Sequence, residues 1–259
     1  MIWCRWQGSF TRFVINSYIY LMKHIEIQPK LFLYIFLAFI GCTIIGTLSH
    51  EYGHIAVAQS LGYKTTLSYQ SMHVDRKAEK AELHRLAYPY LNEIKNKQPY
   101  PAKAAVDAKC RQMHRNDLWI RLGGPLQTML TGTIGFCILW YRRKKSRAAL
   151  FHINDWIFVF LAFFWIRQPS NILHSFGYKI ITGKGHWIGG DEWYISYYLK
   201  VPLWTASVIT GIIGLLIVAY VIFAVIPKKY RLTFLTAGIT GGVAGFLLWM
   251  DYLGPYLLP

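Results

Sequence analysis

Long runs of apolar residues constrain this chain more than any other feature. A helix of about 20 apolar residues crosses a bilayer core about 30 Å thick, and five segments come near that length. They are Leu31 to Ser49, about Leu118 to Tyr141, about Asp155 to Phe176, about Val201 to Ile226 and about Leu232 to Tyr252. These segments predict an all-α, polytopic transmembrane helical bundle, and therefore a multi-pass integral membrane protein. The sequence does not say which membrane holds it.

The charge distribution agrees with a membrane protein. Only 15% of the residues are charged, whereas a soluble domain has roughly 25%. The formal net charge is +16, and much of the basic charge lies in short stretches beside apolar runs, such as residues 141–147 and 227–231. This distribution is typical of contacts with lipid headgroups. We therefore expect the lipid bilayer, and not nucleic acid, as the partner of these cations.

Polar sequence divides the chain into five regions. Residues 1–30 mix basic and apolar residues and predict an interfacial N-terminal helix. Residues 62–117 predict an extramembrane helical loop. Within it, residues 75–117 have mixed charge and helical spacing, and Pro99 and Pro101 separate a second short helix. The other regions are the first membrane helix (31–61), the core membrane helices with the third-ligand segment discussed below (118–200) and the C-terminal membrane helices (201–259).

The stretch HEYGH, residues 50–54, continues the first apolar segment without a break. Positions i and i+4 lie on one face of a helix, so His50 and His54 can bind one zinc ion through their imidazoles. Glu51 would lie beside that ion, where it can take a proton from zinc-bound water and pass it to a leaving amine. A helix end at the membrane interface would explain one such residue. Three in one turn after an uncharged run favour a metal site, with one Zn²⁺ per chain and Glu51 as the catalytic residue.

A catalytic zinc usually takes a third protein ligand, and few candidates lie outside the polar loop. Asp191 follows two glycines in GHWIGGDEWYISYYLK, and we expect it to be the third metal ligand. An aspartate at the start of a helix is also a common N-cap, and Glu192 can take either role. His174 is a further candidate, because it shares a polar stripe with Gln168 and Asn171 that should face the protein interior.

These features together resemble the site-2 protease family of intramembrane zinc metalloproteases. HEYGH at the end of a membrane helix carries the resemblance, and RLGGPLQTMLTG, residues 121–132, is similar to the GPxxN motif of the family. Gln127 and Thr128 occupy the region of that asparagine. The resemblance implies that Asp191 takes the ligand role of the family's aspartate, although no LDG sequence occurs here. It also implies that Asn171 binds substrate backbone.

The resemblance implies a hydrolase that cleaves peptide bonds of a membrane-associated protein or peptide. Two other classes fit the same residues. The first is a non-proteolytic membrane scaffold, regulator or transporter that keeps a zinc-binding fold. The second is a metal-dependent hydrolase that acts on a lipid or a small amide. Zinc content alone does not separate the first class from an enzyme, because both bind zinc. Replacing Glu51 separates them, because only the enzyme should lose its function.

Overall fold

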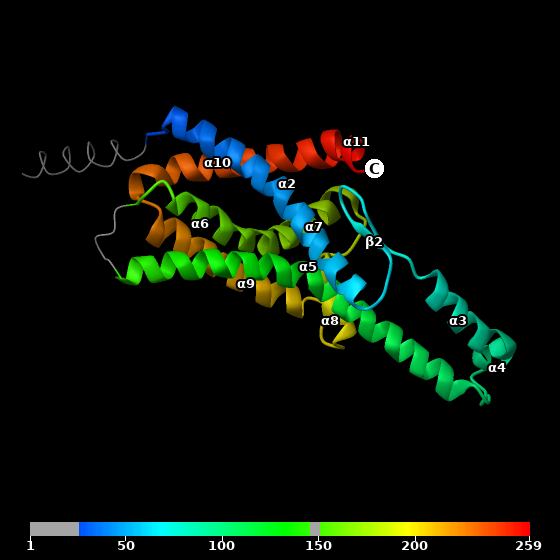
Figure 1. Cartoon of the computed structure of the whole chain (residues 1–259). Helices are drawn as coiled ribbons and strands as arrows, with labels where there is room; N and C mark the ends of the chain where they lie inside the picture. Colours follow the sequence, from blue (N-terminus) through cyan, green and yellow to red (C-terminus); the bar gives the residue numbers. More distant parts are fainter. Residues whose placement is uncertain (1–25, 146–150) are drawn as a thin grey trace, which may run out of the picture.

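The computed structural model describes residues 26–145 and 151–259, and it confirms the predicted helical bundle. Within these residues, five helical segments are long and apolar enough to cross a membrane. They are α2 (Pro29–Ser60), α5 (Lys103–Lys145), α6 to α7 (Asp155–Thr182), α9 with η3 (Thr205–Val225) and α10 to α11 (Lys228–Leu257). Figure 1 shows these segments gathered into one bundle. The predicted interfacial helix falls mostly on residues 1–25, outside the described residues.

The first membrane helix continues through HEYGH as predicted. α2 begins with Pro29, whose fixed φ suits the first turn of a helix. It then runs without interruption to Ser60, and Gly62 at φ +86° begins the following turn. One straight element therefore extends from one end of the bundle to the motif, which places the motif residues about two thirds of the way along the helix.

The second membrane helix differs from the prediction. Pro99 and Pro101 do separate it from what precedes, but no separate short helix follows them, because α5 is one helix of 43 residues from Lys103 to Lys145. Its first half pairs with α3 (Lys77–Ala87), η1 (Tyr88–Tyr90) and α4 (Leu91–Lys95) in a helical hairpin that projects beyond the bundle (Figure 1). The polar and apolar halves of α5 differ only in side chains, so the change in composition at residue 117 is not a helix boundary.

The start of the polar loop is also not helical. Residues 65–74 form a small antiparallel hairpin of β1 (Thr65–Leu67) and β2 (Met72–Val74), with Thr66 opposite His73. β-Branched residues in TTLSYQSMHV favour extended backbone over helix. This β-hairpin lies beside the end of α2 that carries the motif, and it becomes part of the site.

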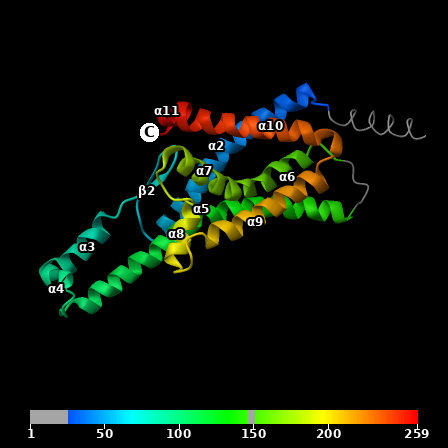
Figure 2. The same cartoon turned by 180° about the vertical axis from the view of Figure 1, so that it is seen from behind.

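The third membrane segment is not interrupted at RQPSN. α6 (Asp155–Ala162), η2 (Phe163–Ile166) and α7 (Arg167–Thr182) follow one another directly, and the 3₁₀ stretch accommodates Pro169 near the start of α7. A Cβ at Gly214 on α9 would lie 2.7 Å from the Trp165 carbonyl oxygen. This close approach holds α9 against the segment, as seen from behind in Figure 2.

The remaining elements are α8 (Asp191–Tyr198), α9 (Thr205–Tyr220), η3 (Val221–Val225), α10 (Lys228–Leu247), η4 (Leu248–Leu253) and α11 (Gly254–Leu257). α10 packs on α2 through glycines, since a Cβ at Gly241 would lie 2.6 Å from the Phe36 carbonyl oxygen. One group of basic residues lies at the end of the bundle opposite the motif, where Arg143 donates a hydrogen bond to the Ala224 carbonyl and Arg142 pairs with Asp155.

Candidate metal centre

The three motif residues are buried where α2 crosses α5. His50 is 0% exposed, Glu51 7% and His54 5%. The two imidazoles extend from one face of α2, as the spacing of four residues requires. Together with Glu51 they form a group that could hold a metal ion, with one donor atom from each residue within 4.8 Å of the others.

One pair of glycines, Gly53 on α2 and Gly123 on α5, brings the two helices close enough to form this group. A Cβ at Gly53 would lie 2.5 Å from the Gly123 carbonyl oxygen, and a Cβ at Gly123 would lie 2.4 Å from that of Gly53. Gly124 has a different role. A Cβ there would lie 2.4 Å from His54 Nε2 and 2.6 Å from His50 Nε2. Glycine at 124 therefore leaves open the space that the two ring nitrogens face.

α5 also orients both imidazoles. His54 Nδ1 lies 2.6 Å from the Ile120 carbonyl oxygen, which can only accept, so Nδ1 carries the proton. The Gly124 amide, 3.2 Å from the same nitrogen, is the longer contact and does not change this assignment. Thr128 Oγ1 donates to the Gly124 carbonyl oxygen and accepts from His50 Nδ1 at 2.9 Å. In the neutral rings, each Nε2 therefore has its lone pair directed into the space beside Gly124.

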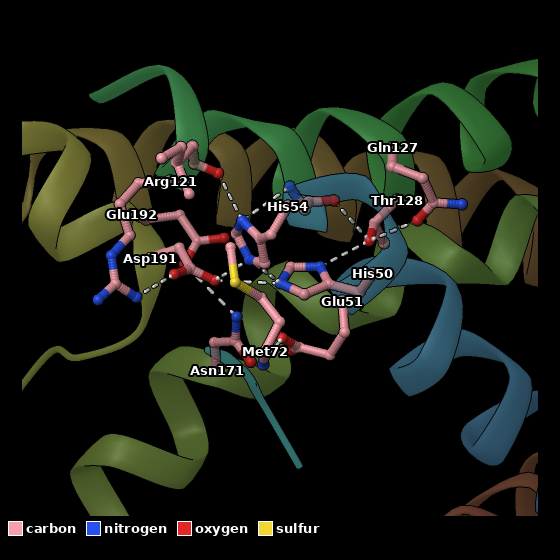
Figure 3. A network of polar contacts seen from close by, with 12 residues as sticks. His50, Glu51, His54, Met72, Arg121, Gln127, Thr128, Asn171, Asp191 and Glu192 are labelled. Atoms are coloured by element: carbon pink, nitrogen blue, oxygen red, sulfur yellow. Dashed lines mark hydrogen bonds and ion pairs between the residues drawn. The ribbon is translucent and has the colours of Figure 1, made fainter. Parts of the chain in front are cut away.

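Asp191 supplies a third donor atom to that space. It is the first residue of α8, and its Oδ2 lies 3.0 Å from His50 Nε2 and 3.1 Å from His54 Nε2 (Figure 3). The two Nε2 atoms are 3.2 Å apart. Its other oxygen, Oδ1, accepts a hydrogen bond from Arg121 Nη1 at 2.9 Å. The Arg121 guanidinium lies over the Tyr194 ring, 4.4 Å from its centroid, so α5 and α8 together fix the carboxylate.

The electrostatics of Asp191 suit a metal ligand. Burial raises the pKa of its carboxyl, and the neighbouring imidazoles of His50 and His54 lower the pKa by more, so that it lies well below its ordinary value. Asp191 is therefore an anion at neutral pH. The two Nε2 atoms and Asp191 Oδ2 lie within 3.2 Å of one another, an arrangement that could hold a metal ion.

Glu51 lies beside this triangle of atoms and has a different partner. Its Oε2 accepts a hydrogen bond of 2.9 Å from the Met72 amide on β2. Figure 3 shows Met72 extending over the site from the strand. The Glu51 carboxylate therefore lies to one side of the metal-binding atoms. The Met72 amide fixes its position, and Asp191, not Glu51, is the acid in contact with the two imidazoles.

Asn171 and Glu192 also come to the site, whereas His174 does not. Asn171 Nδ2 donates to Glu192 Oε2 at 3.4 Å. Glu192 is 2% exposed, and burial raises the pKa of its carboxyl. His174 is exposed and its ring packs against Phe246 on α10, 5.9 Å between centroids. Its position on the surface of α7 excludes it as the alternative third donor.

Sequence reasoning missed the residues that surround the donors. The sequence placed Thr128 in the region of the asparagine of GPxxN but did not predict its contact with His50. Its signal was its spacing of four from Gly124, which places it on the same helix face. Arg121 had a signal too, since it is a charge at the start of an apolar run. The contact of Met72 with Glu51 depends on the β-hairpin and had no sequence signal.

Comparisons with protein-family models, with curated proteins and with solved structures find no match to this chain. The resemblance to site-2 proteases therefore depends on the sequence motifs alone.

Proposed function

We propose that this chain is an intramembrane zinc metallopeptidase. The observation that carries the proposal is the convergence of His50 Nε2, His54 Nε2 and Asp191 Oδ2, with Glu51 beside them, at the motif end of a membrane helix. A buried group of this kind is costly in a membrane segment, and such groups usually mark a functional site.

The size of the triangle supports zinc. Imidazole and carboxylate ligands lie about 2.0–2.2 Å from Zn²⁺, and two ligands of a tetrahedral ion at that distance are about 3.3 Å apart. The three donor atoms are 3.0–3.2 Å apart. The second contacts of the ligands also fit, because metal-binding histidines usually donate their other N–H to a fixed acceptor, as His50 does to Thr128 and His54 to Ile120.

When bound, zinc would lower the pKa of a coordinated water from 15.7 to about 7 and supply a nucleophile at neutral pH. The role of Glu51 follows from its position. Its carboxylate takes a proton from the attacking water and passes it to the nitrogen of the leaving amine, so that the C–N bond breaks to give a carboxylate and an amine. The Met72 amide holds Glu51 Oε2, and the other oxygen is left to exchange protons.

The surrounding elements support a substrate from the membrane. A peptide group in a membrane helix is hydrogen-bonded internally, so the substrate must unwind locally before its carbonyl is attacked. β1 and β2 lie beside the motif end of α2 and present backbone that an unwound segment can approach. This arrangement supports a membrane-associated peptide over a soluble substrate.

The test compares wild type with Glu51→Gln in liposomes that hold a set of single-span membrane peptides. New peptide termini, measured by mass spectrometry, should form with wild type and be lost with Glu51→Gln while zinc content stays the same. Glu82→Gln is a matched control, since Glu82 is half-exposed on the helical hairpin and pairs with Lys109. Equal cleavage by Glu51→Gln would contradict the proposal. Bound zinc with no cleavage of any peptide by wild type would favour the non-proteolytic class.

A further inference from the structure

Arg167 is a cation inside the third membrane segment without a partner in the described structure. It is the first residue of α7. Its Nε is buried and makes no hydrogen bond to any residue in 26–145 or 151–259. Its guanidinium also forms no ion pair with a carboxylate of those residues. A charged side chain in a membrane segment usually pairs with another group or faces a functional cavity, so this donor is available to a ligand.

The helix face of Arg167 turns toward the metal centre. Residues 167, 171 and 175 are spaced by four and share one face of α7. Ser175 Oγ accepts from the Gly189 amide at 3.0 Å. Asn171 donates to Glu192, as Figure 3 shows. This face therefore lies against the segment that carries Asp191.

Glu192 has the complementary unpartnered atom. Its Oε2 accepts from Asn171, whereas its Oε1 is buried and has no hydrogen-bond partner among the described residues. One buried donor atom on α7 and one buried acceptor atom on α8 thus have no partner among the described residues, and Asn171, on the Arg167 face of α7, contacts Glu192. Leaving such groups unpaired is costly, and a ligand that pairs both regains that free energy.

We propose that Arg167 and Glu192 form a subsite for one peptide group of the substrate. The Arg167 guanidinium donates to the carbonyl oxygen, and Glu192 Oε1 accepts from the N–H. A peptide group offers both an acceptor and a donor, whereas an ester of a lipid has no N–H. The subsite thus selects a peptide over a lipid ester. This inference rests on the zinc peptidase function proposed above and names its substrate chemistry.

The test uses two hydroxamate probes on the zinc-loaded full-length chain in detergent, with affinity measured by calorimetry. Acetohydroxamate contacts the metal alone, and acetyl-leucyl-leucine hydroxamate adds peptide groups. Arg167→Met should weaken the peptidyl probe by about tenfold or more, as expected for a lost charge-assisted hydrogen bond. It should leave the zinc content and the acetohydroxamate affinity unchanged. Lys179→Met is the control, because Lys179 lies near the end of the same helix and only bonds Gly183.

A third probe tests Glu192. In this probe, the amide between the two leucines is replaced by an ester, which removes the N–H. Glu192→Met should weaken the peptide probe by about tenfold and leave the ester probe unchanged. No loss in either variant would mean that water alone fills these groups and would overturn the subsite. Equal loss for acetohydroxamate and the peptidyl probe would show a structural role and also overturn it. If wild type holds no zinc and binds neither hydroxamate, the proposed function itself fails.

Discussion

The two ends of the bundle are held together in different ways. At the end opposite the motif, aromatic rings from α2, α6, η2 and α10 pack on one another. Phe234 lies 4.9 Å from Phe163 and 5.5 Å from Phe39, measured between ring centroids. At the motif end, single polar atoms meet single partners, such as Asp191 Oδ1 and Arg121 Nη1.

This difference predicts what a substitution costs at each end. An apolar contact is shared among many atom pairs that each contribute little, so truncating one side chain lowers the free energy of unfolding without displacing a particular metal-binding atom. A polar contact at the motif end fixes one donor atom of the metal site, so its loss should reduce metal affinity with little change in the fold. The substitutions below test the contrast, in order of decreasing effect on metal affinity.

Gly124→Ala should have the largest effect. Its Cβ would lie 2.4 Å and 2.6 Å from the two Nε2 atoms, in the space that the ion would occupy. We expect stoichiometric zinc to be lost, as measured by elemental analysis of the purified protein. Gly41→Ala on α2 is the control, because a Cβ there meets no atom within 4 Å. Full zinc content in Gly124→Ala would show that the metal lies elsewhere.

Asp191→Ala should come next. It removes one of three donor atoms but leaves the space open, so we expect weak residual binding by His50 and His54. The loss in zinc affinity should exceed the tenfold to hundredfold that is typical of outer-shell residues, in competition titrations with a chromophoric chelator. Unchanged affinity would transfer the third-ligand role to Glu51, which also belongs to the group that could hold a metal.

Arg121→Met should have a smaller effect. Arg121 holds the second oxygen of Asp191 and is itself stacked on Tyr194. Outer-shell partners of this kind change metal affinity by about tenfold to hundredfold. The same chelator titration should show a loss in this range. Arg111→Met, at an exposed position on the same helix, should have the zinc affinity of wild type. An equal loss of zinc affinity in both variants would show that the removed positive charge, and not the contact with Asp191, causes the effect.

Phe234→Ala should leave zinc affinity nearly unchanged. Phe234 is 1% exposed in the aromatic cluster, and truncation of a buried phenylalanine costs about 3–5 kcal/mol of stability. We expect a lower unfolding temperature in detergent, with a zinc affinity within about threefold of wild type. Loss of zinc from the folded variant would show that the two ends are coupled and would remove the contrast between them.

The sequence predicted the parts of the site that depend on local geometry. HEYGH on a helix brings His50 and His54 together through the 3.6-residue repeat, whatever the rest of the chain does. The five apolar segments predicted the bundle because the bilayer fixes their length. Asp191 could be proposed but not separated from Glu192 or His174, because the loop between α7 and α8 decides which side chain reaches the histidines.

The rest depended on contacts between distant segments. The approach of Gly53 to Gly123 sets the distance between α2 and α5, and no local pattern states which glycines meet. The polar half of α5 was assigned to a loop because composition changes there, while the helix does not end. The β-hairpin over Glu51 has strands of three residues, too short for alternation to identify.

Metal analysis of the purified wild-type chain tests the central claim most directly. The protein is extracted without chelators, and its zinc content is measured beside that of His54→Ala. We expect about one zinc per wild-type chain, because one triangle of donor atoms holds one ion, and almost none in the variant. Wild-type protein without stoichiometric zinc, or a His54→Ala variant that keeps it, would contradict the account.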